Sequence, residues 1–290
     1  MSYKIIVLAK QVPDTRAVSK DAMTPEGTVN RAALPAIFNP EDLNALEMAL
    51  QIKDANPGST VKIVTMGLPK AAEVIREGLF RGADGGVLLT DRAFAGADTL
   101  ATSYTIATAI KKIGDYDIII GGRQAIDGDT AQVGPQVAEK LGLPQVTYAE
   151  KIESLEGKTI RIKRAITGGV ETVETKLPVV ITVNGSADAC RPRNAKNVMK
   201  YKYAQTPSEA AQKPTPYAAI ADSKPYLKIE EWNNATINAD LQQCGLNGSP
   251  TKVKNVESIV FAAKESKTYS ASDADIEGLM VELLANHTIG

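Results

Sequence analysis

A glycine-rich stretch, Gly121–Gly134, holds the residues whose types and spacing could bind a phosphate. It follows an apolar run, Asp117–Ile120, and precedes a helical pattern from Val133 to Leu141, so the order is strand, loop, helix. Glycines and small polar residues let backbone N–H groups approach a phosphate, and the positive end of the following helix favours negative charge. The stretch therefore predicts a nucleotide site. It matches neither GxGxxG nor GxxxxGK[ST], and an ordinary strand-to-helix turn would show the same spacing.

Other catalytic chemistries have few residues to use. His287 is the one histidine and lies close to the C-terminus, where chains commonly fray, and no Gly-x-Ser-x-Gly elbow is present. Cys190 and Cys244 are far apart and lack CxxC spacing, so we interpret both as reduced structural residues and expect no metal site. We expect no catalytic side chain, and any chemistry should come from a bound cofactor.

The composition is that of an ordinary globular protein. The chain has 290 residues, 43% hydrophobic and 23% charged, enough for a sizeable core. Its 33 basic and 34 acidic residues give a net charge of −1, so no overall field attracts nucleic acid or an anionic membrane. No apolar run approaches the roughly 20 residues of a membrane span, and no signal peptide is recognisable at the start. We therefore expect a cytoplasmic protein.

Short apolar strands alternate with amphipathic helices from residue 4 to about residue 150. Two helix starts carry capping residues, Asn39 before Pro40 and Asp98 before Thr99. The alternation predicts an α/β fold, a doubly wound parallel sheet with helices on both faces. The expected strands are Lys4–Leu8, Val61–Thr65, Val87–Leu89 and Asp117–Ile120, and the expected helices begin at Pro40, Pro69, Thr99 and Val133.

Ligands of such sheets bind beyond the carboxyl ends of the strands, where the winding direction switches. Four loops are expected at that edge: residues 9–14, 65–67, 90–98 and 121–134. The third and fourth loops lead into helices whose N-termini can face phosphate oxygens. The sequence therefore predicts one site built from four loops.

The pattern changes after about residue 150. Three segments alternate at period two, which is typical of antiparallel strands with one solvated face, and we expect them to extend the sheet edge. They are Thr159–Ile166, Gly168–Lys176 and Pro178–Val183. Residues 184–225 are basic, loop-like and rich in proline, as in a solvated connector or in an arm that folds against a partner.

A last helix is expected after Ser272, with Asp275 completing a capping box. Its apolar stripe could cover its own domain or dock on another subunit. We therefore expect a nucleotide-binding α/β domain with antiparallel edge strands at residues 1–185. Residues 186–290 should then form a partner-contacting loop, an extended arm and the C-terminal helix.

Five ordered motifs resemble the beta subunit of electron transfer flavoproteins. They are Val7–Asp14, Asn39–Asp42, Thr65–Gly67, Asp91–Ser103 and Gly122–Pro135. The likeness is close to about residue 145 and similar in plan to about Lys202. It implies an adenine-nucleotide-binding α/β fold of the kind shared with universal stress proteins. It also implies an alpha-subunit partner that carries an electron-transferring FAD.

The beta-subunit site of that family has two known kinds of occupant. Housekeeping members hold AMP as a structural ligand, whereas electron-bifurcating members hold a second FAD that accepts hydride from NADH. This chain resembles the bifurcating members, with Gly128, Thr130 and Ala131 where AMP-type members carry bulkier acidic and amide residues. Small residues leave room for an extended dinucleotide, so FAD is the expected cofactor and AMP the alternative.

The resemblance also implies a route for the electrons. Hydride from NADH reduces the flavin of the beta subunit, and one electron passes to the alpha-subunit FAD and on to an acyl-CoA-dehydrogenase-type enzyme. The other electron passes to ferredoxin or flavodoxin. In the family a loop docks on the dehydrogenase through Leu or Ile, but the matching residue here is Ala195, so this partner is left open. A module that binds an adenine nucleotide without a redox role is a further alternative.

The matched motifs also imply which residues bind the cofactor. Donors to the pyrophosphate are expected from Gln124, Ala125, Gly128, Thr130, Ala131 and Gln132, with Gly122, Val133 and Gly134 beside them. A second contact strip comprises Asp98, Thr99, Leu100, Thr102 and Ser103. The wall around the adenosine comprises Leu8, Ala9, Asn39, Thr65, Met66 and Gly67. For every one of these residues, packing of loops and strand ends is the alternative role.

Three charged residues of the loop have separate expectations. Asp127 and Asp129 would repel a phosphate, so they are expected to cap the next helix or to accept a ribose hydroxyl. Arg123 could neutralise phosphate, steady a reduced flavin or pair with a surface carboxylate.

Overall fold

The computed structural model describes residues 1–14, 35–212, 223–251 and 266–289. Within these residues the chain divides into two compact units. The first unit contains every element from β1 to η5, and the second contains the C-terminal helix α9, Asp273–Ala285. The domain boundary expected after residue 185 stays a prediction.

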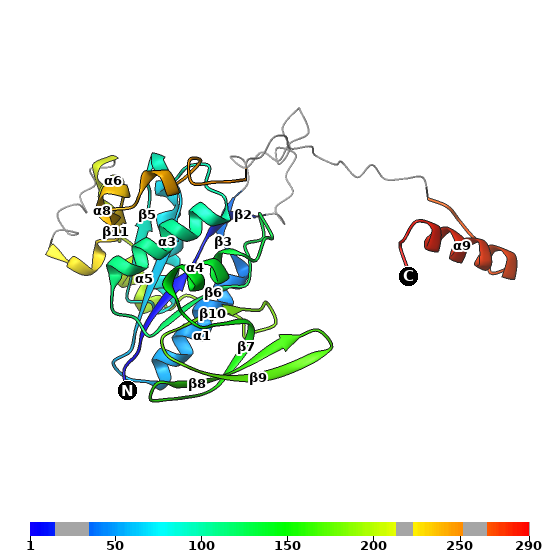
Figure 1. Ribbon diagram of the computed structural model, residues 1–290, viewed down its shortest axis with the longest axis horizontal. Coiled ribbons are helices and arrows are strands. Elements are labelled where there is room, and N and C mark those ends of the chain that lie inside the picture. The colour runs from blue at the N-terminus through cyan, green and yellow to red at the C-terminus, as the bar shows by residue number, and fades with distance from the viewer. Residues whose placement is uncertain (15–34, 213–222, 252–265, 290) are drawn as a thin grey trace. The chain divides into compact units, whose positions relative to one another are not determined.

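A nine-stranded sheet forms the centre of the first unit (Figure 1). Its strands follow in the order β11, β5, β4, β1, β6, β10, β7, β8, β9, and all pairs from β11 to β7 are parallel. Only the β7–β8 and β8–β9 pairs are antiparallel. The bounds are β11 Glu230–Trp232, β5 Gly85–Leu89, β4 Thr60–Met66, β1 Lys4–Leu8, β6 Ile118–Gly122, β10 Val179–Val183, β7 Gln145–Glu156, β8 Thr159–Ile166 and β9 Gly169–Lys176.

The winding of this sheet switches direction at β1. From β1 the chain moves outward to β4 and β5 on one side, and it then returns to place β6 on the other side. In register, Leu8 at the end of β1 lies between Val64 of β4 and Gly121 of β6. A crevice opens beyond the carboxyl ends of strands at such a switch point.

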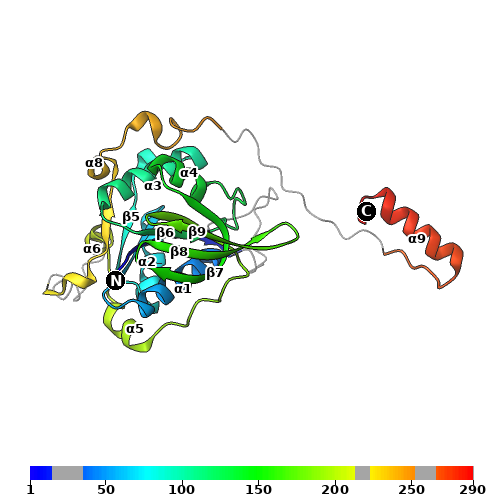
Figure 2. The same ribbon diagram turned by 60° about the horizontal axis from the view of Figure 1, so that its bottom comes forward.

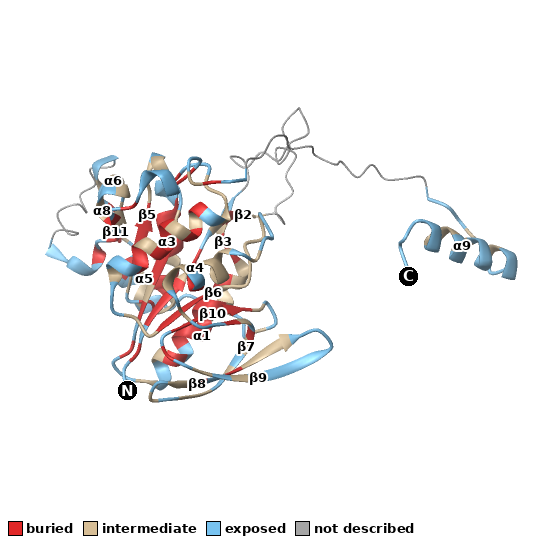
Figure 3. Cartoon of the chain, in the orientation of Figure 1, coloured by how far each residue is buried: buried red, intermediate tan, exposed pale blue. Residues whose placement is uncertain are grey.

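Alternate residues of the parallel strands face opposite sides of the sheet, and each side has its own core. Ile5 and Val7 pack with α1 (Pro40–Ala55) and α2 (Ala72–Arg81), whereas Ile6 packs with α3 (Thr99–Ile113) and α4 (Val133–Leu141). Figure 2 shows the helices on both sides of the strands, and Figure 3 shows that the central strands are buried. The doubly wound α/β fold is therefore confirmed.

The strand at 179–183 differs from the expectation. It was expected as an antiparallel edge strand, but β10 is buried at every position and runs parallel to both β6 and β7. The cause is β7, a 12-residue strand that the period-two pattern did not reveal and that continues the sheet beyond β10. The antiparallel extension consists of β7, β8 and β9.

The connector expected at residues 184–225 contains helices. After β10 the chain forms α5, Ala195–Tyr201, which packs on α2 and buries Tyr201, and then α6, Pro207–Gln212. Residues 213–222 of the expected arm lie outside the described residues. Further along the chain, β11 forms the other edge of the sheet. The short helices around it in sequence are η4 Pro225–Leu227, α8 Asn234–Ile237 and η5 Leu241–Gln243.

Short elements lie next to the strand ends. β2 (Gln11–Pro13) and β3 (Ala36–Phe38) form an antiparallel ribbon after β1. η2 (Pro69–Ala71) precedes α2, and η3 (Arg92–Phe94) follows β5. The ribbon follows β1, η2 follows β4 and η3 follows β5, so all three lie at the carboxyl edge of the sheet, where the four expected loops were placed.

The C-terminal helix α9 begins as expected. The Ser272 side chain accepts the N–H of Asp275, which caps the helix. None of the helix residues is buried, and the apolar side chains of Ile276, Met280 and Leu284 are each about half exposed. No helix within the described ranges is long and apolar enough to cross a membrane.

Candidate functional site: a cavity at the switch point

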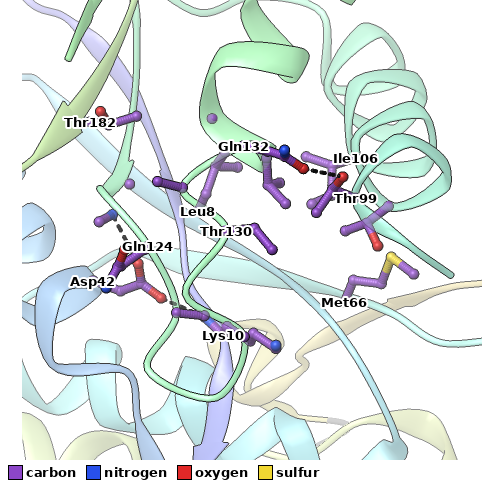
Figure 4. A pocket seen from close by; sticks show the side chains of 18 of the residues that line it. Leu8, Lys10, Asp42, Met66, Thr99, Ile106, Gln124, Thr130, Gln132 and Thr182 are labelled. Carbon is purple, nitrogen blue, oxygen red and sulfur yellow. Dashed lines mark hydrogen bonds between the residues drawn. The ribbon is translucent and has the colours of Figure 1, made fainter. Parts of the chain in front are cut away.

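A cavity of about 800 Å³ opens at the carboxyl edge of the sheet, where the ends of β1 and β6 meet. Leu8 and Lys10 line it from β1 and its following loop, Met66 from β4, and Thr182 from β10 (Figure 4). The loop from Gly121 to Gly134 forms one wall and the start of α3 another. All four loops that were expected to form one site line this cavity. The loop after β4 contributes Met66.

Most of the expected cofactor-binding residues line this cavity. They are Leu8, Ala9, Met66, Asp98, Thr99, Thr102, Gly122, Arg123, Gln124, Ala125, Asp127, Gly128, Asp129, Thr130, Ala131, Gln132, Val133 and Gly134. Five expected residues are not among its lining: Asn39, Thr65, Gly67, Leu100 and Ser103. Thr65 and Ser103 are buried, and Leu100 is 40% exposed.

The loop presents a row of backbone donors. The N–H groups of residues 130–134 donate to no protein acceptor within the described part of the chain. Asp129 and Ala131 have positive φ angles of 49° and 52°, a conformation that non-glycine residues rarely adopt. Backbone strain of this kind persists where the surrounding structure holds it, often at ligand sites. The loop with α4 behind it therefore suits a phosphate group.

The motif Asn39–Asp42 anchors that loop from the start of α1. Asn39 occupies the N-cap position, but its side chain does not cap the helix as expected. Instead, Asn39 Oδ1 accepts the N–H of Ile126 at 3.1 Å, and Asn39 Nδ2 donates to the carbonyl of Gln124 at 2.8 Å. Asn39 is fully buried, so this residue positions the loop from behind.

Arg123 is held by Glu41. Its guanidinium lies 2.9 Å from Glu41 Oε1 and stacks on the ring of Tyr148 with 5.5 Å to the ring centroid. The hydrogen bond to Glu41 raises the pKa of Arg123 above its ordinary value. Tyr148 itself has a φ of 57° and lies beside the register shift between β7 and β10. The pairing with a carboxylate, one of the expected alternatives, is thus present.

The two aspartates of the loop do not cap the following helix. The N-cap of α4 is Gln132, which makes no side-chain cap bond. Asp127 pairs with Lys10, whose Nζ lies 2.7 Å from Asp127 Oδ1, and Asp129 accepts a hydrogen bond of 2.7 Å from Gln124 Nε2. The capping prediction was wrong, because Asp127 pairs with Lys10 of the segment after β1 and Asp129 accepts from Gln124 of the same loop.

The start of α3 forms the opposite wall. Asp98 caps the helix by accepting the N–H groups of Leu100 and Ala101. Thr99 Oγ1 donates to Gln132 Oε1 at 2.8 Å, which links α3 to the start of α4 (Figure 4). Burial acts to raise the pKa of Asp98, but hydrogen bonds from Thr251 and from the helix N–H groups outweigh it and lower the pKa.

Several lining residues were not among those assigned to cofactor binding. Lys10 lies in the loop after β1 that was expected at this edge, but it was given no role of its own. Thr182 was missed because β10 was placed at the sheet edge. Thr251 reaches Asp98 from a distant part of the chain, and no local pattern indicates it. The others are Asp42, Val64, Phe94, Gly96, Ala97, Ile106, Gly121, Val180 and Ile181.

A parallel sheet with a cavity at its switch point is the arrangement in which α/β domains bind their ligands. The sequence pattern of the electron transfer flavoprotein domain matches residues 26–219. The chain therefore belongs to the electron transfer flavoprotein family, and its relatives identify it as a member of the beta-subunit group, whose partner is an alpha subunit.

Three relatives cover most of the chain. It is 47% identical to the electron transfer flavoprotein subunit beta of Clostridium acetobutylicum, over 86% of each chain. It is 44% identical to the caffeyl-CoA reductase-Etf complex subunit CarD of Acetobacterium woodii, again over 86% of each chain. It is 38% identical to protein FixA of Azorhizobium caulinodans, over 96% of this chain and 93% of that protein.

Proposed function

We propose that this chain is the FAD-binding beta subunit of an electron-bifurcating electron transfer flavoprotein. The bound FAD would supply the redox chemistry, taking hydride from NADH and passing electrons to the alpha-subunit FAD and to ferredoxin or flavodoxin. The protein's part is to bind and orient the cofactor, because no acid–base side chain is expected at the site. AMP as a structural ligand is the alternative occupant.

The observation that carries this proposal is the row of backbone N–H groups at residues 130–134. They have no acceptor among the residues that the structure describes, and they line the cavity at the start of α4. None of these residues is buried, so a ligand in the cavity can reach their N–H groups, and the first N–H groups of a helix have no partner within the helix. A pyrophosphate or phosphate offers the acceptor oxygens and the negative charge that a helix N-terminus favours.

Three features support a dinucleotide over a mononucleotide. The cavity volume of about 800 Å³ lies in the upper part of the roughly 300–1,000 Å³ range of small-molecule sites. A Cβ added at Gly128 would meet no atom within 4 Å, so the loop leaves open space there. Apolar side chains such as Leu8, Phe94 and Ile106 line the cavity and suit the flat faces of aromatic rings.

The names of the relatives and the exposed surface of α5 support the proposed partners. CarD is a subunit of a caffeyl-CoA reductase-Etf complex, and a 43% identical relative is an acryloyl-CoA reductase electron transfer subunit. These names support an acyl-CoA-dehydrogenase-type partner here. Ala195 is exposed at the start of α5, and Met199 one turn later is 66% exposed beside Lys196 and Lys200. Met199 offers the apolar side chain that Ala195 lacks.

The test is to purify the complex with its alpha subunit, denature it and separate the released nucleotides. We expect two FAD per heterodimer. One FAD with one AMP would replace the bifurcating proposal with the housekeeping alternative. A complex that releases no flavin would leave only the non-redox module.

A further inference from the structure

Three side chains at the start of α1 hold the nucleotide loop through alternate residues. Asp42 Oδ1 accepts the N–H of Gly122 at 2.8 Å, and Glu41 Oε2 accepts the N–H of Gln124 at 3.0 Å. Asn39 Oδ1 accepts the N–H of Ile126 at 3.1 Å. The N–H groups of every second loop residue are therefore bonded, as along one edge of a β-strand, but the acceptors are side chains at the start of α1. These bonds leave the N–H groups further along the loop free for a ligand.

Asp42 differs from the other two because it also accepts a backbone N–H from the segment after β1. Its Oδ2 accepts the N–H of Lys10 at 2.8 Å, so one carboxylate joins the segment after β1 to the end of β6. Asp42 is 6% exposed and lines the cavity (Figure 4). A Cβ at Gly122 would collide with Asp42 Oδ1 and with the backbone of Glu41, so only glycine permits this approach. Asp42 thus fixes the two strand ends at the switch point.

Only an ionised carboxylate can make both bonds well. A protonated carboxyl or an amide turns one of its two polar atoms into a donor, which would face a backbone N–H. Burial raises the pKa of Asp42 to about 7, although the N–H groups of Lys10 and Gly122 act to lower it. Neighbouring charges do not neutralise it, because the Lys10 side chain pairs with Asp127 and Arg123 pairs with Glu41. Glu41 itself acts to raise the pKa of Asp42.

We propose that Asp42 is a positioning residue for the bound nucleotide: its carboxylate holds Lys10 and Gly122 together and thereby sets the shape of the loop that binds the phosphates. The proposal rests on the proposed function of this cavity. It adds a residue that contacts the loop backbone rather than the ligand, and it makes nucleotide retention dependent on the charge of that residue.

The test compares Asp42→Asn with Asp117→Asn in the complex with the alpha subunit. Asp117 accepts the N–H of Lys4 at 2.9 Å at the opposite end of the same two strands, and one accepted bond can be kept by an amide. The cavity is emptied and then titrated with FAD and, separately, with AMP. We expect Asp42→Asn to bind its nucleotide about tenfold more weakly, the effect of losing one charge-assisted hydrogen bond. Asp117→Asn should bind as the wild type does.

The pH profile separates positioning from simple support of the fold. Wild-type nucleotide release should accelerate as the pH falls through about 7, because protonation of Asp42 removes one of its two bonds. Asp42→Asn should release at one fast rate across that range. Equal affinity and an unchanged pH profile in Asp42→Asn would overturn the proposal while leaving the function intact. A wild-type complex that binds neither FAD nor AMP would overturn both.

If Asp42→Asn fails to fold, two further measurements still test the proposal. Glu41→Gln, at a half-buried residue, loses one of the bonds to Gln124 or Arg123 and should also weaken nucleotide binding. In the wild type, hydrogen exchange of the Lys10 and Gly122 amides, corrected for intrinsic rate, should speed up below about pH 7. Amide protection that is unchanged between pH 5 and pH 8 would show that the carboxylate does not hold these strand ends.

Discussion

Lys10 and Asp127 form an ion pair between two loops that line the cavity, with Lys10 Nζ 2.7 Å from Asp127 Oδ1. The Asp127 side chain is only 14% exposed, whereas that of Lys10 is 49% exposed. The pair neutralises a carboxylate that would otherwise repel a phosphate at the adjacent N–H groups. The electrostatics of the site therefore depend on a lysine that does not belong to the glycine-rich loop.

The first prediction removes that lysine. Lys10→Met should weaken nucleotide binding severalfold, because the charge of Asp127 is left uncompensated near the phosphate-binding loop, and exposed ion pairs are worth about 0–1 kcal/mol. The loss should be larger at low salt, where charges are less screened. Titrations at two ionic strengths measure it. The double variant Lys10→Met/Asp127→Asn should recover affinity, and Lys4→Met, which loses a pair with Asp115 at the start of β1, should have no effect.

The second prediction concerns the seat of α4 on the sheet. A Cβ at Gly134 would collide with Thr182 Cγ2 of β10, so Gly134→Ala should destabilise the fold by about 1–3 kcal/mol. Helix propensity alone would favour alanine, so the sign of the change reports the collision. Thr182→Ser removes the colliding methyl and should restore stability in the double variant. Denaturant unfolding measures the changes, and Gly169→Ala, at an open site on β9, is the control. A stabilised Gly134→Ala would contradict this packing.

Much of the fold was predictable because apolar runs and capping residues are local signals. Asp98 caps α3 as its sequence position indicates, and β1, β4, β5 and β6 lie where apolar runs were found. β10 was misplaced because its segment was interpreted as an alternating edge strand, although all five of its residues are buried. The difference arises from β7, which pairs with β10 across a bulge near Tyr148.

The sequence predicted which segments line the candidate site, but it did not predict the contacts that hold those segments in place. The glycine-rich loop and the start of α3 were expected at the cavity, and the structure places them there. The roles of Asn39, Asp127 and Asp129 were assigned from helix-capping preference, which considers only neighbours in sequence. In the folded chain Asn39 bonds to Gln124 and Ile126, Asp127 to Lys10 and Asp129 to Gln124, and such pairings leave no periodic signal.

The third prediction is a pH dependence of stability due to Asp42. Its pKa is raised from 3.8 to about 7 by burial, so the folded chain binds this proton more tightly than the unfolded chain. The stabilising contribution is therefore complete below about pH 4 and is lost as the pH rises through about 7. The slope is at most about 1.4 kcal/mol per pH unit.

Unfolding free energies at pH 5 and pH 8 check this sign. Between these values the wild type should lose stability relative to Asp42→Asn, which has no carboxyl to titrate at that position. Asp117→Asn should follow the wild-type profile, because Asp42 is intact in it. A wild-type profile parallel to that of Asp42→Asn would show that Asp42 is already ionised at pH 5. The stability trend runs opposite to nucleotide retention, which favours the carboxylate.

The fourth prediction concerns assembly with the alpha subunit. The apolar side chains of Ile276, Met280 and Leu284 on α9 are about half exposed in this chain, so an interface of the obligate type, roughly 2,000 Å² or more, should cover them. Met280→Asp should weaken the heterodimer without unfolding either subunit, whereas Glu277→Gln on the same helix should not. Sedimentation at several concentrations measures the dissociation. A monodisperse beta subunit that binds FAD tightly by itself would contradict the prediction.

The last prediction tests the proposed function through the loop. Gly128→Asp and Thr130→Lys should fold, because both positions are exposed and Gly128 borders open space, but they should lose the beta-site nucleotide. Added bulk blocks the approach of phosphate to the backbone, and the aspartate adds like charge. Gly169→Asp, also at an exposed position with open space, is the matched control and should keep its nucleotide.

These variants also decide where NADH delivers hydride. In stopped-flow absorbance, NADH should rapidly bleach the flavin of the wild-type complex without any dehydrogenase present. Because we propose that hydride enters at the beta site, both loop variants should lose the rapid phase while the alpha-subunit flavin stays bound. Rapid, unchanged reduction in a variant shown to lack the beta-site flavin would refute this route. A fully loaded wild-type complex that NADH does not reduce would instead favour the AMP-type carrier.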